Sequence, residues 1–549
     1  MKFTSFAFFA LAFACSPRAP RTETPIAPPP APTSARPAPR LVLWLTVDQL
    51  GSNVLERQAR HLPGSALGRL FDEGLWFSEA AYGHAVTETA PGHATLFTGA
   101  PPCIHGIVGN EWYDRAAKRL TISVYDSEAP LVGPGAPATQ KPDAGRSPRL
   151  LRAPTIGDAL HQAHGPAARV VSISIKDRAA ILSAGRSGEA YWLGPDGWVT
   201  STYYAKKAPV WLERAAAEKP VESYVKDGWP LLLAVDQYSA KPAASSYAPH
   251  WGPGFPHRPP ESTSAREALK LSPFGDRAAF DLGRAALVSE RLGEDDVVDL
   301  LAISLSATDY VGHYYGLDSL EAEDSFVRLN DELGSFLRFV EEKVGKERLL
   351  VVLSADHGGS ESAEALSQLG LPGRRLTIAA LTEAAQGALV AQSGSKEWLS
   401  AVVPPYVVLD RAAISARGKE FNEMRAAVRA ALEHVAGVHS VAVVGEPSDD
   451  GELGRRISES IFPGRSGDLY VVPDPHTLLL QEDVLGATHG SPWSYDSRVP
   501  ILLRGASVPS GRVRRPVAVA SLAPTVARLL GVSPPAGATR TLLTEALVP

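Results

Sequence analysis

Cysteine is scarce in this 549-residue chain, which contains only Cys15 and Cys103. Two cysteines do not make a disulfide framework, so the stability of the protein has to come from a packed core. A chain of this length can bury a large core without such cross-links. The hydrophobic share of 44% and the charged share of 21% are ordinary for globular proteins, which excludes disorder for the bulk of the chain.

A surplus of basic residues is also missing. Lysine and arginine together number 54, against 60 aspartate and glutamate residues, which gives a formal net charge of −6 at pH 7. Proteins that bind nucleic acid normally carry a basic surplus, because contacts to the phosphate backbone dominate their affinity. The composition therefore argues against a nucleic-acid partner.

The apolar run at the N-terminus is too short to cross a bilayer. It extends from Phe3 to Ala14, whereas a membrane-spanning helix needs about 20 apolar residues. A lysine precedes the run, and the small-x-small sequence Ala12-Phe13-Ala14 at its end is typical of a cleavage site. Residues 1–14 are therefore predicted to be a secretory signal peptide, and the protein is expected to be exported.

Cys15 follows this cleavage site directly, an arrangement that resembles the lipobox of bacterial lipoproteins. The resemblance implies that Cys15 is lipidated and anchors the chain to a membrane, and Ser16 in the next position implies sorting to the outer membrane. Ala12 replaces the leucine that is usual three residues before the cysteine, so plain secretion remains open. The expected location is the periplasm, or the outer membrane of a bacterium as a lipoprotein.

The next segment is rich in proline and alanine. Residues 16–40 consist almost entirely of Pro, Ala, Thr, Ser and Arg, and they show no apolar periodicity. Such a composition favours an extended, semi-rigid polyproline spacer. Residues 15–40 are therefore predicted to be a lipidated cysteine with its linker, and residues 41–549 to be the folded catalytic body.

Five apolar, β-rich runs recur along this body. They comprise residues 41–47, 169–175, 297–305, 349–353 and 499–503. Continuous apolar runs are typical of strands that are buried on both faces of a parallel sheet. The clearest helical pattern between them covers residues 319–344, and Asp318 with Glu321 can cap its start. The alternation predicts an α/β fold with a doubly wound, mostly parallel sheet flanked by helices.

Two stretches depart from this alternation. Residues 200–275 are rich in Tyr, Trp, Pro and Gly, and residues 361–480 contain further helical and strand-like segments. Both are interpreted as insertions into the sheet topology rather than as independent domains.

Aspartate and histidine residues follow three of the apolar runs, and a further histidine lies in a glycine-flanked loop. They are Asp48, Asp309 with His313, Asp356 with His357, and His489. Ligands of open α/β sheets bind beyond the carboxyl ends of the strands. Carboxylate and imidazole donors in this mixture suit zinc, and two neighbouring ions would clamp both ends of a phosphoryl displacement.

Each of these elements has an ordinary explanation when it is taken alone. An Asp-His pair is more often a capped turn, and a lone loop histidine more often lies on the surface. Asp309 and His313 could be an ordinary helical pair. The convergence of four such elements on strand ends is what favours a metal site.

A candidate nucleophile lies in residues 86–99, a predicted loop that enters a helix. Pro91 suits the first helical turn, where its missing N–H is not needed. Thr89 then lies at the positive end of the helix dipole, which favours an anion, and a metal has to activate its hydroxyl. Taken alone, a helix cap is the simpler interpretation of Thr89.

The order of these elements resembles the alkaline phosphatase superfamily. It comprises Asp48, Thr89-Ala90-Pro91-Gly92-His93, Asp309-x-x-x-His313, Asp356-His357-Gly358 and Thr488-His489-Gly490. The chain is most similar to the threonine-nucleophile, phosphate-irrepressible alkaline phosphatases, including residues 105–113, and the resemblance covers nearly the whole folded body. It implies an alkaline phosphatase-like fold and two Zn²⁺ ions. One ion would be held by Asp309, His313 and His489, and the other by Asp48, Asp356, His357 and the oxygen of Thr89.

Lys176 and Arg178 follow the second apolar run. In the resembling phosphatases a Lys-x-Arg pair at this place contacts the non-bridging phosphate oxygens, and so does the asparagine that matches Asn110. A monoester dianion suits two cations and an amide donor, whereas a diester has one charge fewer and would gain more from an apolar cavity. The alternative for the Lys-Asp-Arg sequence alone is a solvated strand end.

The expected activity is metal-dependent hydrolysis of small phosphate monoesters through a phosphothreonine on Thr89. A type I phosphodiesterase or nucleotide pyrophosphatase is the nearest alternative, because it shares the metal ligands and the threonine. A sulfatase is disfavoured, since the Cys/Ser-x-Pro-x-Arg sequence is absent around Thr89. A third alternative is a metal-containing surface protein that binds ligands without catalysis.

Overall fold

The structure, a computed structural model, describes residues 38–243, 251, 254–393, 395–447, 451–480, 486–505 and 507–548. The expected signal peptide, the expected lipidation site Cys15 and nearly all of the expected linker lie outside the described residues. Among the described helices, none combines the length and the apolar character that a membrane span requires.

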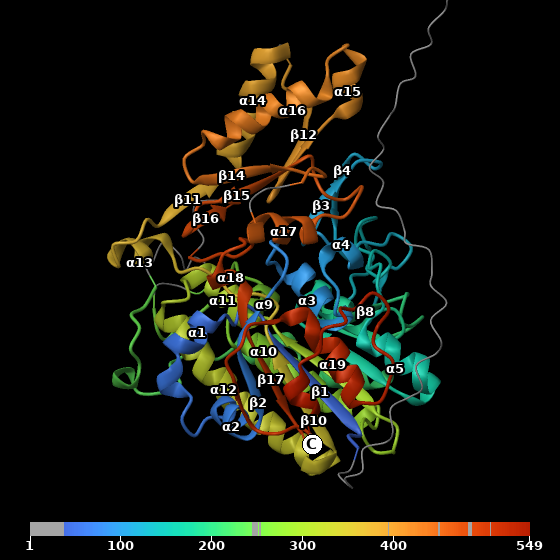
Figure 1. Ribbon diagram of the computed structural model, residues 1–549. Coiled ribbons are helices and arrows are strands. Elements are labelled where there is room, and N and C mark those ends of the chain that lie inside the picture. Colours follow the sequence, from blue (N-terminus) through green and yellow to red (C-terminus); the bar gives the residue numbers. More distant parts are fainter. Residues whose placement is uncertain are drawn as a thin grey trace, which may run out of the picture. The chain divides into compact units, whose positions relative to one another are not determined.

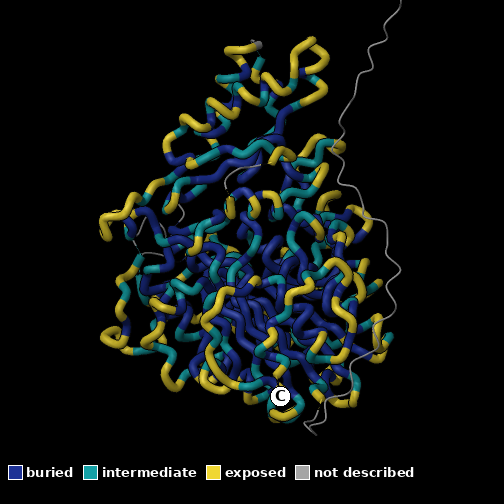
Figure 2. The backbone as a smooth tube through the Cα atoms, viewed as in Figure 1, coloured by how far each residue is buried: buried dark blue, intermediate teal, exposed yellow. Residues whose placement is uncertain are grey.

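An eleven-stranded sheet forms the centre of the folded body (Figure 1). In spatial order its strands are β18 (Gly511–Val513), β2 (Leu75–Ala81), β17 (Arg498–Arg504), β10 (Leu349–Ser354), β1 (Leu41–Val47), β9 (Asp299–Leu305), β6 (Val170–Ser174), β7 (Glu189–Leu193), β8 (Trp198–Ser201) and β5 (Leu131–Val132), with β19 (Val517–Ala518) paired to β2. Strands β10, β1, β9, β6 and β7 are mutually parallel. Every residue of β1, β6, β9 and β10 is buried. Figure 2 shows dark blue, the colour of buried residues, throughout the centre of the folded body. The expected α/β class and the mostly parallel central sheet are thus present.

The parallel assignment of the fifth apolar run is wrong. Strand β17 contains residues 499–503, but it runs antiparallel to both of its neighbours, β10 and β2. An uninterrupted apolar run reports burial on both faces, and β17 is as deeply buried as the parallel strands. Burial therefore does not determine the direction of a strand.

Helices pack on the sheet and on one another. Those that matter for the site or the core are α2 (Ala66–Glu73), α3 (Thr89–Thr98), α6 (Asp177–Ala184), α10 (Phe274–Ser289), α11 (Ala307–Tyr315), α12 (Leu320–Val344) and α19 (Leu522–Leu529). Helix α12 lies where the apolar pattern predicted it, but its expected cap is wrong. The Ser319 hydroxyl, rather than Asp318, accepts the N–H of Ala322. Serine is as good a cap as aspartate, and it stands one residue nearer to the helix.

The segment that was expected as the second insertion contains a sheet of its own. Strands β12 (Leu399–Val403), β13 (Tyr406–Leu409), β15 (Leu469–Pro473) and β14 (Val438–Val443) pair in that order. Helices α14 (Ile378–Ser393) and α16 (Phe421–Glu433) pack beside them (Figure 1). A short parallel pair, β11 (Arg374–Thr377) with β16 (Thr477–Leu480), joins the two ends of the segment. Their apolar side chains form a separate core that includes Leu389, Val407 and Val428.

The aromatic segment 200–275 packs into the main core. It contains α7 (Val210–Glu218), α8 (Val221–Val225) and α9 (Ala265–Lys270), and the indoles of Trp229 and Trp251 are fully buried. The buried carboxylate of Asp324 on α12 ties part of this segment down. It accepts hydrogen bonds from Trp229 Nε1 at 2.7 Å and from the Tyr238 hydroxyl at 2.5 Å.

We expect Asp324→Ala to lower the free energy of unfolding by about 3–5 kcal/mol, because it leaves buried donors without an acceptor and Arg328 without its buried partner. Urea unfolding followed by tryptophan fluorescence measures this change. Asp331→Ala, at an exposed position of the same helix, is the matched control and should change little. Similar losses for both variants would contradict the anchoring role of Asp324.

Candidate functional site

Four neighbouring parallel strands each lead into a charged residue at their carboxyl ends. Strands β10, β1, β9 and β6 are adjacent in that order, and they are followed by Asp356, Asp48, Asp309 and Lys176, respectively. Because parallel strands end at the same edge of a sheet, these four side chains converge on one place. All four are buried.

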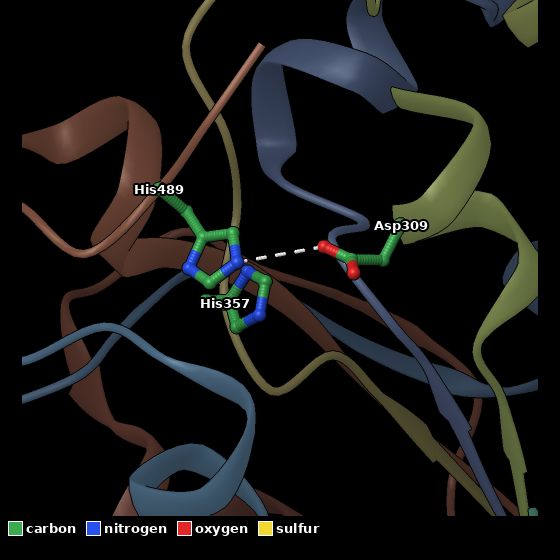
Figure 3. Close-up of side chains that lie close together, drawn as sticks. All are labelled: Asp309, His357 and His489. Carbon is green, nitrogen blue, oxygen red and sulfur yellow. Dashed lines mark ion pairs between the residues drawn. The ribbon is translucent and has the colours of Figure 1, made fainter. Parts of the chain in front are cut away.

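The predicted metal ligands come together in two overlapping groups. The ligand atoms of Asp48, Asp356 and His357 all lie within 4.8 Å of one another, and so do those of Asp309, His357 and His489. Figure 3 shows the second group, in which His489 Nε2 lies 3.5 Å from Asp309 Oδ1. His313 Nε2 lies 3.2 Å from the same Asp309 oxygen. His357 thus belongs to both groups. The resemblance had implied that it belongs only to the group with Asp48 and Asp356.

The three histidines share one orientation. In each ring Nδ1 lies at hydrogen-bond distance from a backbone carbonyl oxygen, and because a carbonyl only accepts, Nδ1 must carry the proton. The pairs are His313 with Ala487 at 2.8 Å, His357 with Gly358 at 2.8 Å, and His489 with Thr87 at 2.9 Å. Nε2 is then left as the free donor of a lone pair, as in metal-binding histidines. Burial lowers the pKa of both His357 and His489, which favours the neutral, metal-binding form.

Three buried carboxylate oxygens have no hydrogen-bond partner among the described residues. They are Asp48 Oδ1, Asp309 Oδ1 and Asp356 Oδ2. Burial and the neighbouring Asp356 carboxylate raise the pKa of Asp48 well above its ordinary value. Divalent cations would satisfy the three oxygens and offset the repulsion between the carboxylates. The donor set therefore fits a metal cofactor.

Thr89, the expected nucleophile, lies beside both groups. It is the first residue of α3, and its Oγ1 lies 3.5 Å from His357 Nε2. The ammonium of Lys176 is 3.3 Å from the same hydroxyl, 2.6 Å from Asp48 Oδ2 and 2.5 Å from Asp309 Oδ2. The fully buried lysine is therefore central to the site.

Arg178 is not brought into contact with these residues. In the described part of the chain its guanidinium has no hydrogen bond to any of the expected metal ligands or to Thr89, and its Nε is buried without a partner. It lines a separate cavity together with Lys176 and Tyr310. Both cations of the Lys-x-Arg pair thus line this cavity, but Lys176 alone of the two also contacts Asp48, Asp309 and Thr89.

Asn110 is held against the start of α3. Its side-chain Oδ1 accepts the N–H of Ala90 at 2.9 Å, and its own backbone N–H donates to Glu88 Oε2 at 2.7 Å. The described residues make no hydrogen bond to the side-chain amide nitrogen of Asn110. Sequence analysis missed Glu88, although an acid immediately before the expected nucleophile was a visible signal. Burial raises the pKa of Glu88 to about 7.

His93 supports the site from within α3. Its Nδ1 lies 2.9 Å from the carbonyl oxygen of Thr89 and 3.2 Å from Asp356 Oδ2, and its Nε2 lies 2.9 Å from Ser304 Oγ. Gly92 lets the helix pass close to Asp356, since a Cβ built there would be 2.1 Å from the Asp356 carbonyl oxygen. Helix α3 is therefore positioned directly against the loop that contains the expected ligand Asp356.

A cavity of about 280 Å³ adjoins the site. Its lining includes Asn110, His313 and His489, together with mostly apolar residues of the 361–480 segment, among them Val403 and Val471. Glu88, which directly precedes Thr89, also lines this cavity.

Comparison with known proteins identifies the family. The model of the type I phosphodiesterase / nucleotide pyrophosphatase family matches residues 42–492.

The chain belongs to this family.

Its relatives within the type I phosphodiesterase / nucleotide pyrophosphatase family include phosphatases. Alkaline phosphatase PafA from Elizabethkingia meningoseptica is 31% identical over 531 residues, which cover 94% of this chain and 96% of that protein. A protein named calcium-transporting ATPase, from Myroides odoratus, is 31% identical over 525 residues, covering 93% and 95% of the two chains. The expected resemblance to alkaline phosphatases with a threonine nucleophile is confirmed.

Solved structures agree with the family assignment. The crystal structure of wild-type PafA has a TM-score of 0.87 at 30% identity and covers 94% of this chain and 100% of that chain. A PafA variant with one threonine, one asparagine, one lysine and one arginine substituted has a TM-score of 0.86 at 29% identity, with the same coverage. The expected alkaline phosphatase-like fold is thus confirmed.

We expect Gly92→Ala to disturb the site, because the new methyl group would force α3 away from Asp356. The free energy of unfolding should fall by about 1–3 kcal/mol, and the metal content measured by mass spectrometry should fall with it. Gly387→Ala on α14 is the matched control, since a Cβ there meets nothing within 4 Å. Unchanged metal content and stability in Gly92→Ala would show that this close approach is not required.

Proposed function

We propose that this protein is a metal-dependent phosphatase that hydrolyses phosphate monoesters through a phosphothreonine on Thr89. The observation that carries the proposal is the convergence of unpartnered carboxylate oxygens and free imidazole Nε2 atoms beside the Thr89 hydroxyl, with Lys176 Nζ only 3.3 Å from that hydroxyl. The similarity to alkaline phosphatase PafA supports the same reaction.

The metal cofactor is proposed to be two Zn²⁺ ions. Carboxylate oxygens and neutral imidazoles form the donor set that zinc prefers. One ion would be held by Asp309, His313 and His489, and the other by Asp48, Asp356, His357 and Thr89. When bound, the ions supply Lewis-acid stabilisation of the attacking and leaving oxygens.

Thr89 is proposed to act by in-line displacement. Its Oγ1 forms the new bond to phosphorus, and the bond from phosphorus to the ester oxygen breaks. Water then cleaves the phosphothreonine and releases phosphate. The placement of Thr89 at the N-terminal end of α3 helps here, because the helix dipole favours the anionic phosphoryl group.

Three further residues are proposed to bind the non-bridging oxygens. Lys176 supplies a point charge, Arg178 can bind bidentately, and Asn110 donates from its amide nitrogen, which the contact of Oδ1 with Ala90 N–H orients. Threonine, asparagine, lysine and arginine are also the four residue types substituted in the solved PafA variant, in the same chain order. A phosphate monoester dianion matches this set of donors.

Diester hydrolysis is the second candidate function. The apolar wall of the 280 Å³ cavity, with Val403, Val471 and Leu478, could receive an organic substituent. A diester has a single negative charge, so it would gain less from Lys176 and Arg178 and more from this wall. The buried ammonium of Lys176 beside Thr89 favours the monoester.

Export is part of the proposal as well. Residues 1–14 would be removed as a signal peptide, and Cys15 with the linker to residue 40 would tether the protein as a bacterial lipoprotein. Residues 41–549 would act as one catalytic body that carries the insertions 200–275 and 361–480.

Thr89→Ala should lower kcat/KM for p-nitrophenyl phosphate by about 10³-fold or more, because the nucleophile is lost. Thr89→Ser should retain a large part of the activity, since it keeps an oxygen at the same place. Metal content by mass spectrometry controls for loss of the cofactor and is expected to be two zinc ions per chain in the wild type. More than a tenth of wild-type activity in Thr89→Ala, or an inactive zinc-loaded wild type, would favour a non-catalytic binding protein.

Lys176→Ala and Arg178→Ala should lower monoesterase kcat/KM by about 10²-fold or more, because both cations bind the dianion. Hydrolysis of bis-p-nitrophenyl phosphate should fall by much less. Lys207→Ala, an exposed lysine, is the charge-matched control. Equal losses on the two substrates would show that the pair does not distinguish monoesters, and a wild-type preference for the diester would reverse the assignment.

A further inference from the structure

A second cavity, of about 310 Å³, lies beside Lys176 and Arg178. None of the expected metal ligands lines it, so it is distinct from the cavity that adjoins the metal groups. Among its charged lining residues, five are basic and one is acidic. The charged residues are Arg146, Lys176, Asp177, Arg178, Arg266 and Lys270.

Only part of this positive charge is neutralised within the protein. Asp177 pairs with Arg146 at 2.7 Å. In the described part of the chain, neither Arg266 nor Lys270 has an ion pair with an acid, and Arg178 Nε is buried without a partner. The cavity therefore carries cations in excess over acids.

Helix α9 brings two of these cations to the same wall. Arg266 and Lys270 are four residues apart, so they lie on one face of the helix. Like charges at this spacing repel each other, and the one carboxylate that lines the cavity, Asp177, is already paired with Arg146. The Arg266 Nε donates to the carbonyl oxygen of Gly194 at 2.6 Å, which fixes the guanidinium at the cavity.

Tyr310 connects the wall formed by α9 to the expected metal ligands. The ammonium of Lys270 lies 4.5 Å from the centre of its ring, and the ammonium of Lys176 lies 4.9 Å from the same centre. Tyr310 follows the expected ligand Asp309 directly in α11. A ligand in the cavity would therefore lie close to the phosphoryl group that the site is proposed to hold.

We propose that this cavity is a second anion-binding site, which receives an oxyanion in addition to the phosphoryl group under attack. The inference rests on the proposed function. Lys176 and Arg178 serve the reacting phosphoryl group, so Arg266 and Lys270 remain for a further phosphate or carboxylate. The source of that oxyanion is either the far end of a substrate with two anionic groups or a free inorganic phosphate.

Lys270→Gln tests the site without touching the proposed catalytic residues. Two substrates that differ only at one end, 3-hydroxypropyl phosphate and propane-1,3-diyl bisphosphate, are compared by kcat/KM. We expect the preference for the bisphosphate to fall by about 3- to 10-fold in the variant, while turnover of the monophosphate stays within about twofold of the wild type.

Lys343→Gln is the matched control. Lys343 is exposed, also lies over an aromatic ring, that of Phe339 at 6.0 Å, and does not line the cavity. Its substitution should leave the substrate preference unchanged. The same change of preference in both lysine variants would overturn the proposal, since it would then reflect the overall charge of the protein.

Inhibition by inorganic phosphate distinguishes the two sources. A higher inhibition constant in Lys270→Gln with an unchanged substrate preference supports a free oxyanion, and a changed preference supports the substrate's far end. If neither quantity changes, the cavity is not an anion site.

Absence of wild-type turnover with either ester would contradict the proposed function instead. Phosphate binding to the wild type and to Lys270→Gln, measured by calorimetry, would then test the cavity alone.

Discussion

The crowding of three buried carboxylates at one edge of the sheet is the constraint on which the site depends. Asp48, Asp309 and Asp356 follow adjacent parallel strands, and each retains an oxygen without a hydrogen-bond partner among the described residues. Burying such groups is costly unless cations compensate them. The ammonium of Lys176 compensates two of the carboxylates, and metal ions would compensate all three. The hydroxyl of Thr89, the proposed nucleophile, lies 3.3 Å from the ammonium of Lys176.

Helix α3 positions the Thr89 hydroxyl beside these carboxylates. All ten of its residues are buried, so its position is determined by packing on every side. Gly92 permits close approach to the Asp356 backbone, and His93 Nδ1 bonds to the carbonyl oxygen of Thr89 while lying 3.2 Å from Asp356 Oδ2. The proposed nucleophile and one group of expected metal ligands are thereby held as one unit. Such rigidity is what a displacement reaction needs, because reacting atoms must be aligned before the reaction.

Sequence patterns predicted the buried strands β1, β6, β9, β10 and β17, because burial on both faces leaves an uninterrupted apolar run. They did not predict the antiparallel direction of β17, since burial is the same in both directions. The intermediate position of His357 and the separation of Arg178 from the metal groups depend on side-chain orientation, which residue spacing does not encode. Both cavities are formed by segments that are distant in sequence, so no local pattern could reveal them.

The two cavities near the site differ in the chemistry of their walls. Next to His313 and His489, the wall contributed by the 361–480 segment is apolar, whereas next to Lys176 and Arg178, the wall contributed by α9 is basic. Both walls come from segments that were interpreted as insertions, while the charged centre comes from the sheet itself. Under the proposed function, substitutions in those segments would alter substrate preference without displacing an expected metal ligand. The sheet would then hold the reacting atoms, and the two segments would select the substrates that reach them.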